Sequence, residues 1–165
     1  MIYVTVGNHD QPFDRLVKAM DALAGKLGME AVIQKGVSAY APQNARWKDF
    51  YAFDESETFF KNADAVVGHA GIGTVISARK WNTPLVICPR RKLFGEHFND
   101  HQMEISQELI KNPRPLVEVA MEVEEIEDKL ASLLEKSAGD KAVAAEGGAS
   151  AEGLKKAIKD FLNGL

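Results

Sequence analysis

The sequence predicts an α/β domain in which helices cover both faces of a Rossmann-like parallel sheet. Two observations lead to this prediction. Short β-branched runs, such as Ile2–Val6 and Ala65–Val67, alternate with stretches in which apolar residues recur at helical spacing. Short turns, some of them rich in glycine, join the two kinds of segment. Strands that alternate with helices in this way usually form a parallel sheet.

The length and composition suit one soluble domain. The chain has 165 residues, of which 45% are hydrophobic and 27% charged, close to the average of globular proteins. No repeat or second domain is evident, so we expect residues 1–165 to form a single domain. The one cysteine, Cys88, lies in an apolar run, which predicts a buried and reduced thiol.

Charge and hydropathy argue against two classes of partner. A net charge of -4 and a pI near 5.6 provide no basic field for a nucleic acid. The N-terminus shows no signal, and no stretch approaches the roughly 18 apolar residues of a membrane span. We therefore expect a cytoplasmic protein that does not bind nucleic acid.

The first half of the chain predicts three strands and two helices. The strand Ile2–Val6 leads into a helix with apolar residues from Phe13 to Leu27, for which Asp10 is the expected N-cap and Pro12 lies in the first turn. The expected second and third strands are Ala31–Gln34 and Asp49–Phe53. Asp54 and Glu57 resemble a capping box that opens a short helix ending near Asn62.

The second half continues the alternation. A fourth strand, Ala65–Val67, runs into a glycine-rich turn and a helix that ends near Trp81, and Pro84–Cys88 is a fifth strand. Residues 89–100 form a polar loop. The remaining expected elements are a helix over 101–111, an edge strand at Leu116–Val119, a helix over 122–136, a flexible connection over 137–150 and a final helix over 151–163. The last two helices either cover the sheet or present an apolar face to a partner or a second copy.

The strongest local motif is the turn Gly68–Thr74, which joins a buried strand to the start of a helix. Glycines allow the backbone to approach a bulky anion, and the free amides and positive dipole of a helix N-terminus stabilise it. A diphosphate fits such a turn. A glycine-rich turn also forms for purely steric reasons, so this motif alone does not decide the function.

A second cluster of polar residues follows the fifth strand, in a loop expected to lie beside the glycine-rich turn. Arg90 can offset phosphate charge, and side chains with several hydrogen-bonding groups can bind sugar hydroxyls. The cluster contains Arg90, Glu96, Asn99, Asp100 and Gln102. The alternative is an ordinary solvated loop.

A third cluster, Gly7-Asn8-His9, ends the first strand. His9 can accept a proton or contact a phosphate, although an exposed histidine beside a capping aspartate needs no function. His97 and His101 are four residues apart, but their polar neighbours suit a sugar site equally well, so no metal site is expected. No arrangement of Ser-His-Asp or Cys-His is evident.

Taken in order, these motifs resemble the C-terminal, UDP-sugar-binding domain of family 28 glycosyltransferases. The specific feature is the pairing of His69–Thr74 (His-Ala-Gly-Ile-Gly-Thr) with Gly95–Gln102 (Gly-Glu-His-Phe-Asn-Asp-His-Gln). The openings Val4–Asn8 and Gln11–Leu16 are similar to small stand-alone members of the family. These include the catalytic subunit of the two-component dolichyl-diphosphate N-acetylglucosaminyltransferase and bacterial exopolysaccharide glycosyltransferase subunits. The similarity extends over most of residues 1–119.

The resemblance implies a single lobe of a two-lobed glycosyltransferase fold. It implies a catalytic subunit that transfers a hexose of the GlcNAc, Gal or GlcA type from a UDP-sugar to a lipid-linked saccharide acceptor. The transfer would be inverting and metal-independent, with the UDP-sugar as donor substrate and no cofactor. A membrane-associated partner subunit would recruit the acceptor and hold this chain peripherally at the inner face of the membrane.

The resemblance also implies roles for individual residues. Gly71, Gly73 and Thr74 would hold the diphosphate, with His69 as a phosphate contact. Asp100 and Gln102 would bind sugar hydroxyls. The full expected donor-binding set is Gly7, Asn8, His69, Gly71, Gly73, Thr74, Arg90, Glu96, Asn99, Asp100 and Gln102, and His9 is the candidate base within this chain.

Two departures from the family pattern leave alternatives open. Ser77 stands where related transferases carry a glutamate for the ribose, for which Glu96 is the candidate substitute, and Asn8 stands where small members usually have threonine. The first alternative is a non-catalytic nucleotide-sugar-binding or scaffold module of a polysaccharide synthesis complex. The second is a UDP-sugar epimerase, which requires a further lobe and extra carboxylates within one chain.

Overall fold

The computed structural model describes the backbone of residues 1–144 and the side chains of residues 1–137. The predicted final helix over 151–163, and the end of the predicted flexible connection, lie outside these residues. The beginning of that connection is helical, because the last helix continues to Ala144.

Six strands form one sheet in the order β3-β2-β1-β4-β5-β6, and every neighbouring pair is parallel. This confirms the predicted Rossmann-like class. The order of the strands reverses between β1 and β4, the point at which ligands bind in open α/β sheets. The strands are β1 (Ile2–Thr5), β2 (Ala31–Gln34), β3 (Arg46–Lys48), β4 (Ala65–His69), β5 (Leu85–Cys88) and β6 (Val117–Val119).

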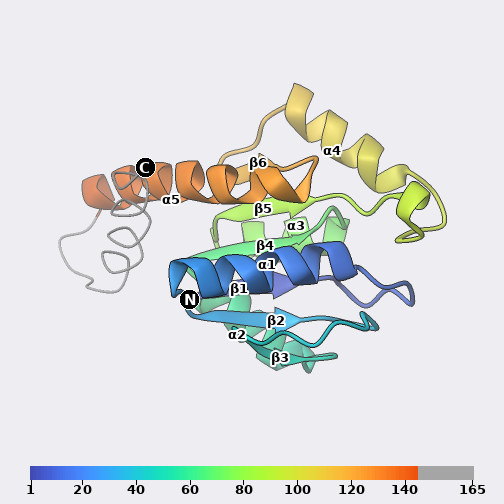
Figure 1. The fold of residues 1–165 in the computed structure, drawn as a ribbon. Coiled ribbons are helices and arrows are strands. Elements are labelled where there is room, and N and C mark those ends of the chain that lie inside the picture. Colours follow the sequence, from blue (N-terminus) through green and yellow to red (C-terminus); the bar gives the residue numbers. More distant parts are fainter. Residues whose placement is uncertain (145–165) are drawn as a thin grey trace.

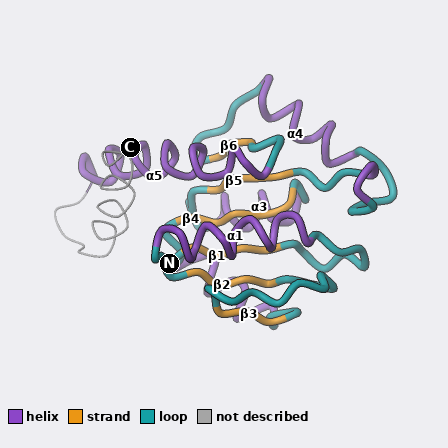
Figure 2. The backbone as a smooth tube through the Cα atoms, in the orientation of Figure 1, coloured by secondary structure: helices purple, strands orange, loops and turns teal. Residues whose placement is uncertain are grey.

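Helices cover both faces of the sheet (Figures 1 and 2). Helices α1 and α5 pack on one face, while α2 and α3 pack on the other. α4 contacts β6 at the sheet edge. The helices are α1 (Asp14–Leu27), α2 (Phe53–Asn62), α3 (Ile72–Lys80), α4 (His101–Lys111) and α5 (Ile126–Ala144), with short 3-10 turns η1 (Lys92–Phe94) and η2 (Val123–Glu125).

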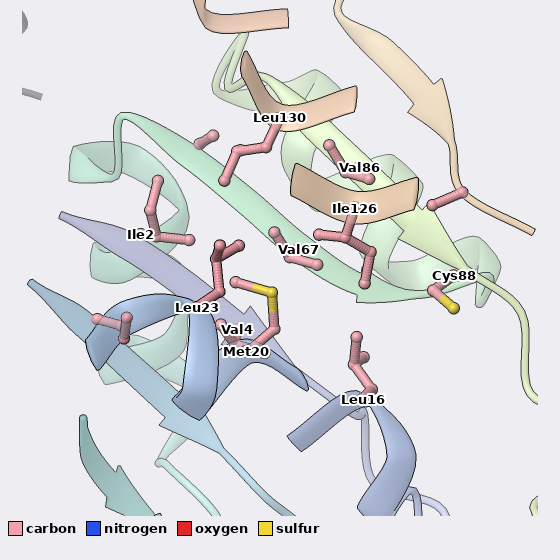
Figure 3. Close-up of a cluster of buried hydrophobic side chains, with 14 of the residues drawn as sticks. Ile2, Val4, Leu16, Met20, Leu23, Val67, Val86, Cys88, Ile126 and Leu130 are labelled. Atoms are coloured by element: carbon pink, nitrogen blue, oxygen red, sulfur yellow. The ribbon is translucent and has the colours of Figure 1, made fainter. Parts of the chain in front are cut away.

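The larger part of the core lies between the sheet and the helices α1 and α5 (Figure 3). Alternate residues of β1 point to opposite faces, so Ile2 and Val4 face these helices while Tyr3 packs under α2. Cys88 is also buried in this layer as a free thiol, as predicted, and burial raises its pKa to about 11. The side chains that fill the layer in Figure 3 include Leu16, Met20 and Leu23 of α1 and Ile126 and Leu130 of α5.

The prediction of the third strand was wrong by several residues. The strand is Arg46–Lys48, whereas residues 49–52 form a loop that leads into α2. The aromatic residues that favoured a strand there are exposed, Phe50 by 47% and Phe53 by 79%. β3 is an edge strand with all three side chains exposed, and its charged residues give no apolar signal but suit an edge.

The predicted start of the first helix was also wrong. α1 begins at Asp14, and no side chain caps its N-terminus. The backbone carbonyls of Gln11 and Pro12 instead accept hydrogen bonds from the guanidinium of Arg90, 2.8 and 3.2 Å long. This long-range contact keeps the segment before α1 out of the helix.

The expected capping box at the second helix is displaced. α2 begins at Phe53, so Asp54 and Glu57 both lie within it. It is Glu55 whose carboxylate accepts a hydrogen bond from the amide of Ala52, at 3.0 Å. Glu57 takes no part in the cap, and its carboxylate accepts hydrogen bonds from Lys80 and Trp81 at the end of α3.

Candidate functional site

A cavity of about 280 Å³ lies at the carboxyl ends of β1 and β4, at the point where the strand order reverses. The loop after β1, the glycine turn after β4 and one face of α2 form its walls. The lining residues are Thr5, Gly7, Asn8, Gln34, Phe53, Ser56, Glu57, Phe60, His69, Gly73, Thr74 and Ser77.

The glycine turn places a helix N-terminus at this cavity. Gly71 is the N-cap of α3, and the amide of Thr74 donates to its carbonyl at 3.1 Å. The amides of Ile72 and Gly73, the first two of the helix, have no acceptor within it. Together with the helix dipole they make this end of the cavity favourable for an anion.

His69, the last residue of β4, is held between two glycines. A β-carbon at Gly7 would lie 2.5 Å from Cε1 of the imidazole, and one at Gly71 would collide with its Nε2. Nδ1 of His69 lies 3.3 Å from the hydroxyl of Thr74. The close approach of the ring therefore requires glycine at positions 7 and 71, and at position 7 the positive φ of 74° favours glycine as well.

The imidazole of His69 is neutral at physiological pH. Its pKa is lowered to about 4, mainly because burial disfavours the charged form, and further by the positive charge of Arg90. A neutral imidazole can donate one hydrogen bond to a ligand oxygen but adds no charge.

Gln34, at the end of β2, fixes the loop after β1. Its side-chain amide donates to the carbonyl of Gly7 at 3.2 Å and to Oδ1 of Asn8 at 3.1 Å. Its Oε1 accepts from the amide of Tyr51 at 3.1 Å. The side chain of Asn8 is exposed, and its orientation is fixed by its hydrogen bond to the buried Gln34.

Arg90 does not line the cavity, in contrast to its expected direct contact with the donor. Its side chain is fully buried. The guanidinium donates to the backbone carbonyls of Val6, Gln11, Pro12 and Glu96 at 2.7 to 3.2 Å, while its Nε has no partner among the described residues. Burial lowers its pKa to about 10, so it remains charged. Its charge lowers the pKa of both His9 and His69, which shows that its field reaches this end of the sheet.

Glu96 is likewise buried, and it forms an ion pair with Arg15 of α1. Nε and Nη2 of Arg15 donate to the two carboxylate oxygens, each at 3.0 Å. The amide of Arg91 donates to Oε2 at 2.9 Å. The carboxylate thus accepts three hydrogen bonds from within the protein, and it does not line the cavity as the expected substitute on a ribose would.

Three further expected residues lie on the same loop and at the start of α4. Asn99 and Asp100 are exposed, and Oδ1 of Asp100 accepts from the amide of Lys92 at 3.1 Å. Gln102 is buried, and its Oε1 accepts from the amide of Arg90 at 3.1 Å. Oδ1 of Asn99 accepts from the amide of His101 at 3.1 Å. None of the three residues lines the cavity.

His9 lies beside the cavity. Its ring stacks on that of His97, with centroids 4.7 Å apart, and contacts Phe98. Nδ1 accepts from the amide of Gln11 and lies 3.2 Å from Oδ1 of Asp10. Its pKa is lowered, first by burial and then by the charges of Arg90 and His97, so the ring is unprotonated near neutral pH.

The structure thus places Gly7, Asn8, His69, Gly73 and Thr74 around one cavity, with Gly71 at the N-cap beside it. Sequence reasoning missed Gln34 and the wall contributed by α2, because no local motif marks residues that reach the site from other elements.

Within the described residues, no cluster of three His, Cys, Asp or Glu side chains could hold a metal ion. Among the helices of residues 1–144, none combines the length and the apolar character needed to cross a bilayer.

The fold and the site define a Rossmann-like α/β domain with a glycine turn and a helix N-terminus at the switch point of its sheet. The chain belongs to the glycosyltransferase family 28 C-terminal domain family, whose model matches residues 1–161. The resemblance in the motifs is therefore confirmed at the level of the family.

Two relatives carry the same name, UDP-N-acetylglucosamine transferase subunit ALG13. The protein from Mus musculus is 31% identical over 120 residues, which cover 66% of this chain and 10% of the relative. The protein from Debaryomyces hansenii is 35% identical over 54 residues, or 33% of this chain and 24% of the relative. The matched segments are thus a small part of both relatives.

Solved glycosyltransferases share the fold. The kitacinnamycin glycotransferase aligns with a TM-score of 0.59 at 18% identity, over 96% of this chain and 39% of that one. The calicheamicin glycosyltransferase CalG4 aligns with a TM-score of 0.57 at 19% identity, over 98% of this chain and 38% of that one. Similarity at such low identity concerns the fold alone.

Proposed function

We propose that this domain is the donor-binding and catalytic subunit of a hexosyltransferase that uses a UDP-sugar. The observation that carries the proposal is the cavity at the N-terminus of α3, lined by Gly73 and Thr74, in a chain of this family. The sugar transferred is of the GlcNAc, Gal or GlcA type, and the acceptor is a lipid-linked saccharide.

The diphosphate of the donor would occupy the N-terminal end of α3. The amides of Ile72 and Gly73 and the hydroxyl of Thr74 are the donors available there. In an inverting transfer an acceptor hydroxyl attacks the anomeric carbon, and negative charge grows on the leaving diphosphate. Preorganised amides stabilise that charge, and the buried charge of Arg90 adds a favourable field without direct contact. This chemistry requires no metal.

The transferred sugar would extend from the diphosphate toward the loop after β5. Asn99 and Asp100 are exposed there and supply acceptors and donors for sugar hydroxyls. Gln102 would act indirectly, since its side chain holds the backbone of Arg90. Asn8 stands on the other side, at the end of β1.

His9 is our candidate for the general base within this chain. It is unprotonated near neutral pH because of its lowered pKa, and its side chain is partly exposed beside the cavity. A base must be in its unprotonated form to take the proton of the attacking hydroxyl.

The acceptor would be held by a second, membrane-associated subunit, which would keep this chain at the inner face of the membrane. One fact supports this part of the proposal: the two relatives are named as subunits.

The test is calorimetric titration of the chain, alone and co-purified with its partner, with UDP, UDP-N-acetylglucosamine, UDP-galactose, UDP-glucuronic acid and ADP. The decisive variant is Gly73→Ala, because Gly73 lines the cavity within α3 and a β-carbon there meets no atom within 4 Å. The variant should fold with equal or slightly higher stability, since alanine favours a helix. It should bind uridine diphosphates at least tenfold more weakly, because the new methyl group occupies the anion site.

Gly28→Ala is the matched control. Gly28 ends α1 with φ of 58°, an added β-carbon there also meets no atom within 4 Å, and the residue does not line the cavity. Its replacement should lower stability and leave UDP affinity unchanged. Unchanged affinity in Gly73→Ala would contradict the assignment of the cavity. Binding without sugar transfer in the presence of the partner would favour a non-catalytic binding module instead.

A further inference from the structure

A groove of about 790 Å³ runs along β6, the last strand at one edge of the sheet. β6 lies between α4 and α5 (Figure 1), and the described strands include no partner for its outer edge. Among the described residues, the groove shares no lining residue with the cavity at the glycine turn. It is thus a second concave site, which the proposed function does not use.

The walls of the groove are largely apolar, yet water still reaches them. Ile110 of α4 is 52% exposed, and Leu109, Leu116 and Val117 are half-buried. Exposed apolar surface gathered in a concave site is unfavourable in water and commonly marks a docking site.

The charged side chains of the groove are mostly paired with one another. Glu118 of β6 forms ion pairs with Lys129 at 3.7 Å and with Lys136 at 2.7 Å, both from α5. Arg114, the other charged lining residue, is exposed to water. The occupant that suits this groove therefore has an apolar face for its walls and a polar back for the solvent.

The sequence beyond α5 contains such a face. Residues 151–163, here called segment 151–163, carry four large apolar residues at helical spacing: Leu154, Ile158, Phe161 and Leu162. In a helix these four side chains would form one stripe, and charged residues such as Lys156 and Asp160 would lie on the opposite side.

The connection is long enough to bring this segment back to the groove. α5 continues for eight residues beyond Lys136, which lines the groove, a distance of about 12 Å. Residues 145–150 can span up to about 20 Å when extended. A link of this length also holds the segment at a local concentration in the millimolar range, far above that of a second copy in dilute solution.

We propose that segment 151–163 is a helix that docks in this groove, with its apolar stripe against Ile110 and Leu116. It would cover the outer edge of β6, as a helix or loop commonly covers an edge strand. The segment is then part of this domain rather than an arm that reaches a partner subunit.

The test is cross-linking of the whole chain, carrying Ile110→Cys and Phe161→Cys, by a short bismaleimide in dilute solution. The native thiol does not compete, because Cys88 is buried and its pKa is raised to about 11. The product should be a cross-linked monomer, which intact mass spectrometry identifies by the mass of one added linker.

The matched control carries Ile76→Cys with Phe161→Cys. Ile76 is 59% exposed, but it belongs to α3 and does not line the groove. This pair should form the cross-linked monomer at least tenfold more slowly.

A double-mutant cycle is the second measurement. Ile110→Asp and Phe161→Asp should each raise the equilibrium constant of unfolding by about tenfold, because each places a charge in an apolar contact. If the two side chains meet, the double variant should exceed either single variant by less than about threefold. Ile76→Asp combined with Phe161→Asp should instead show the product of the two separate effects.

Three results would overturn the proposal. Equal rates of cross-linking in the two pairs would mean that the segment approaches the whole surface alike. Cross-linked dimers in place of monomers would mean that the groove holds the segment of a second copy. Independent effects of Ile110→Asp and Phe161→Asp would mean that the two sides do not meet. UDP binding enters none of these measurements, so the proposed function stands or fails separately.

Discussion

The imidazole of His69 packs directly on the backbone of Gly7, so closely that a β-carbon at position 7 would lie 2.5 Å from its Cε1. This contact joins the loop that follows β1 to the last residue of β4, at the switch point of the sheet. Gly7 also has φ of 74°, a conformation that residues with a side chain rarely adopt. The shape of the cavity therefore depends on the absence of one methyl group.

Gly7→Ala should lower the free energy of unfolding by roughly 2–5 kcal/mol, since the backbone strain adds to the collision with the ring. Gly95→Ala isolates the first of these effects, because Gly95 has φ of 68° but no atom within 4 Å of an added β-carbon. It should cost about 1–2 kcal/mol. Urea unfolding followed by fluorescence measures both. If both variants lose the same free energy of unfolding, the collision with His69 does not contribute to the effect of Gly7→Ala.

The low pKa of His69 predicts a loss of stability in mild acid. Its pKa is about 4 in the folded chain, against 6.5 when the side chain is unperturbed. Above pH 6.5 the residue is neutral in both states and contributes nothing. As the pH falls from 6.5 toward 4, the unfolded chain binds the proton first, so the free energy of unfolding decreases by up to about 3 kcal/mol.

Denaturation at pH 7.5 and pH 4.5 tests this effect. The wild type should lose about 2–3 kcal/mol more between these two values than His69→Gln does. His101→Gln, an exposed replacement at the start of α4, should behave as the wild type does. A pH dependence that is the same in all three proteins would mean that His69 becomes protonated in the folded state without penalty.

The sheet and most helices could be predicted because their signals are local. Runs such as Ala65–Val67 are apolar on both faces, as a strand covered on both sides must be, and glycine marks the turn that follows. β3 could not be predicted, since an exposed edge strand such as Arg46–Lys48 carries no apolar pattern. The strand was recognisable only through its pairing with β2.

The candidate site was predictable where the backbone itself forms it. Glycines after β1 and β4 are visible in the sequence, whereas Gln34 and Glu57 reach the cavity from elements whose positions only the fold determines. Two residues of the polar loop after β5 show the opposite case. Arg90 and Glu96 are residue types expected at a ligand site, yet both are buried and hydrogen-bonded to partners from distant parts of the chain. Composition alone does not reveal which polar groups are used within the protein.

The ion pair between Arg15 and Glu96 supplies the last prediction. The two residues are 81 positions apart, and their pairing fixes the loop after β5 to α1. The carboxylate also accepts from the amide of Arg91, so its removal leaves both an arginine and a backbone amide with poorer partners. Glu96→Gln should therefore lower the free energy of unfolding by roughly 3 kcal/mol, the usual cost of breaking a buried pair from one side.

Glu104→Gln is the matched control for this variant, because Glu104 is exposed and pairs only with His101 among the described residues. It should change stability by less than about 0.5 kcal/mol. The loop carries Asn99 and Asp100, so Glu96→Gln should in addition weaken binding of a UDP-sugar more than binding of UDP. If the two affinities fall by the same factor, the loop does not contact the sugar, and the proposed place of the transferred hexose is wrong.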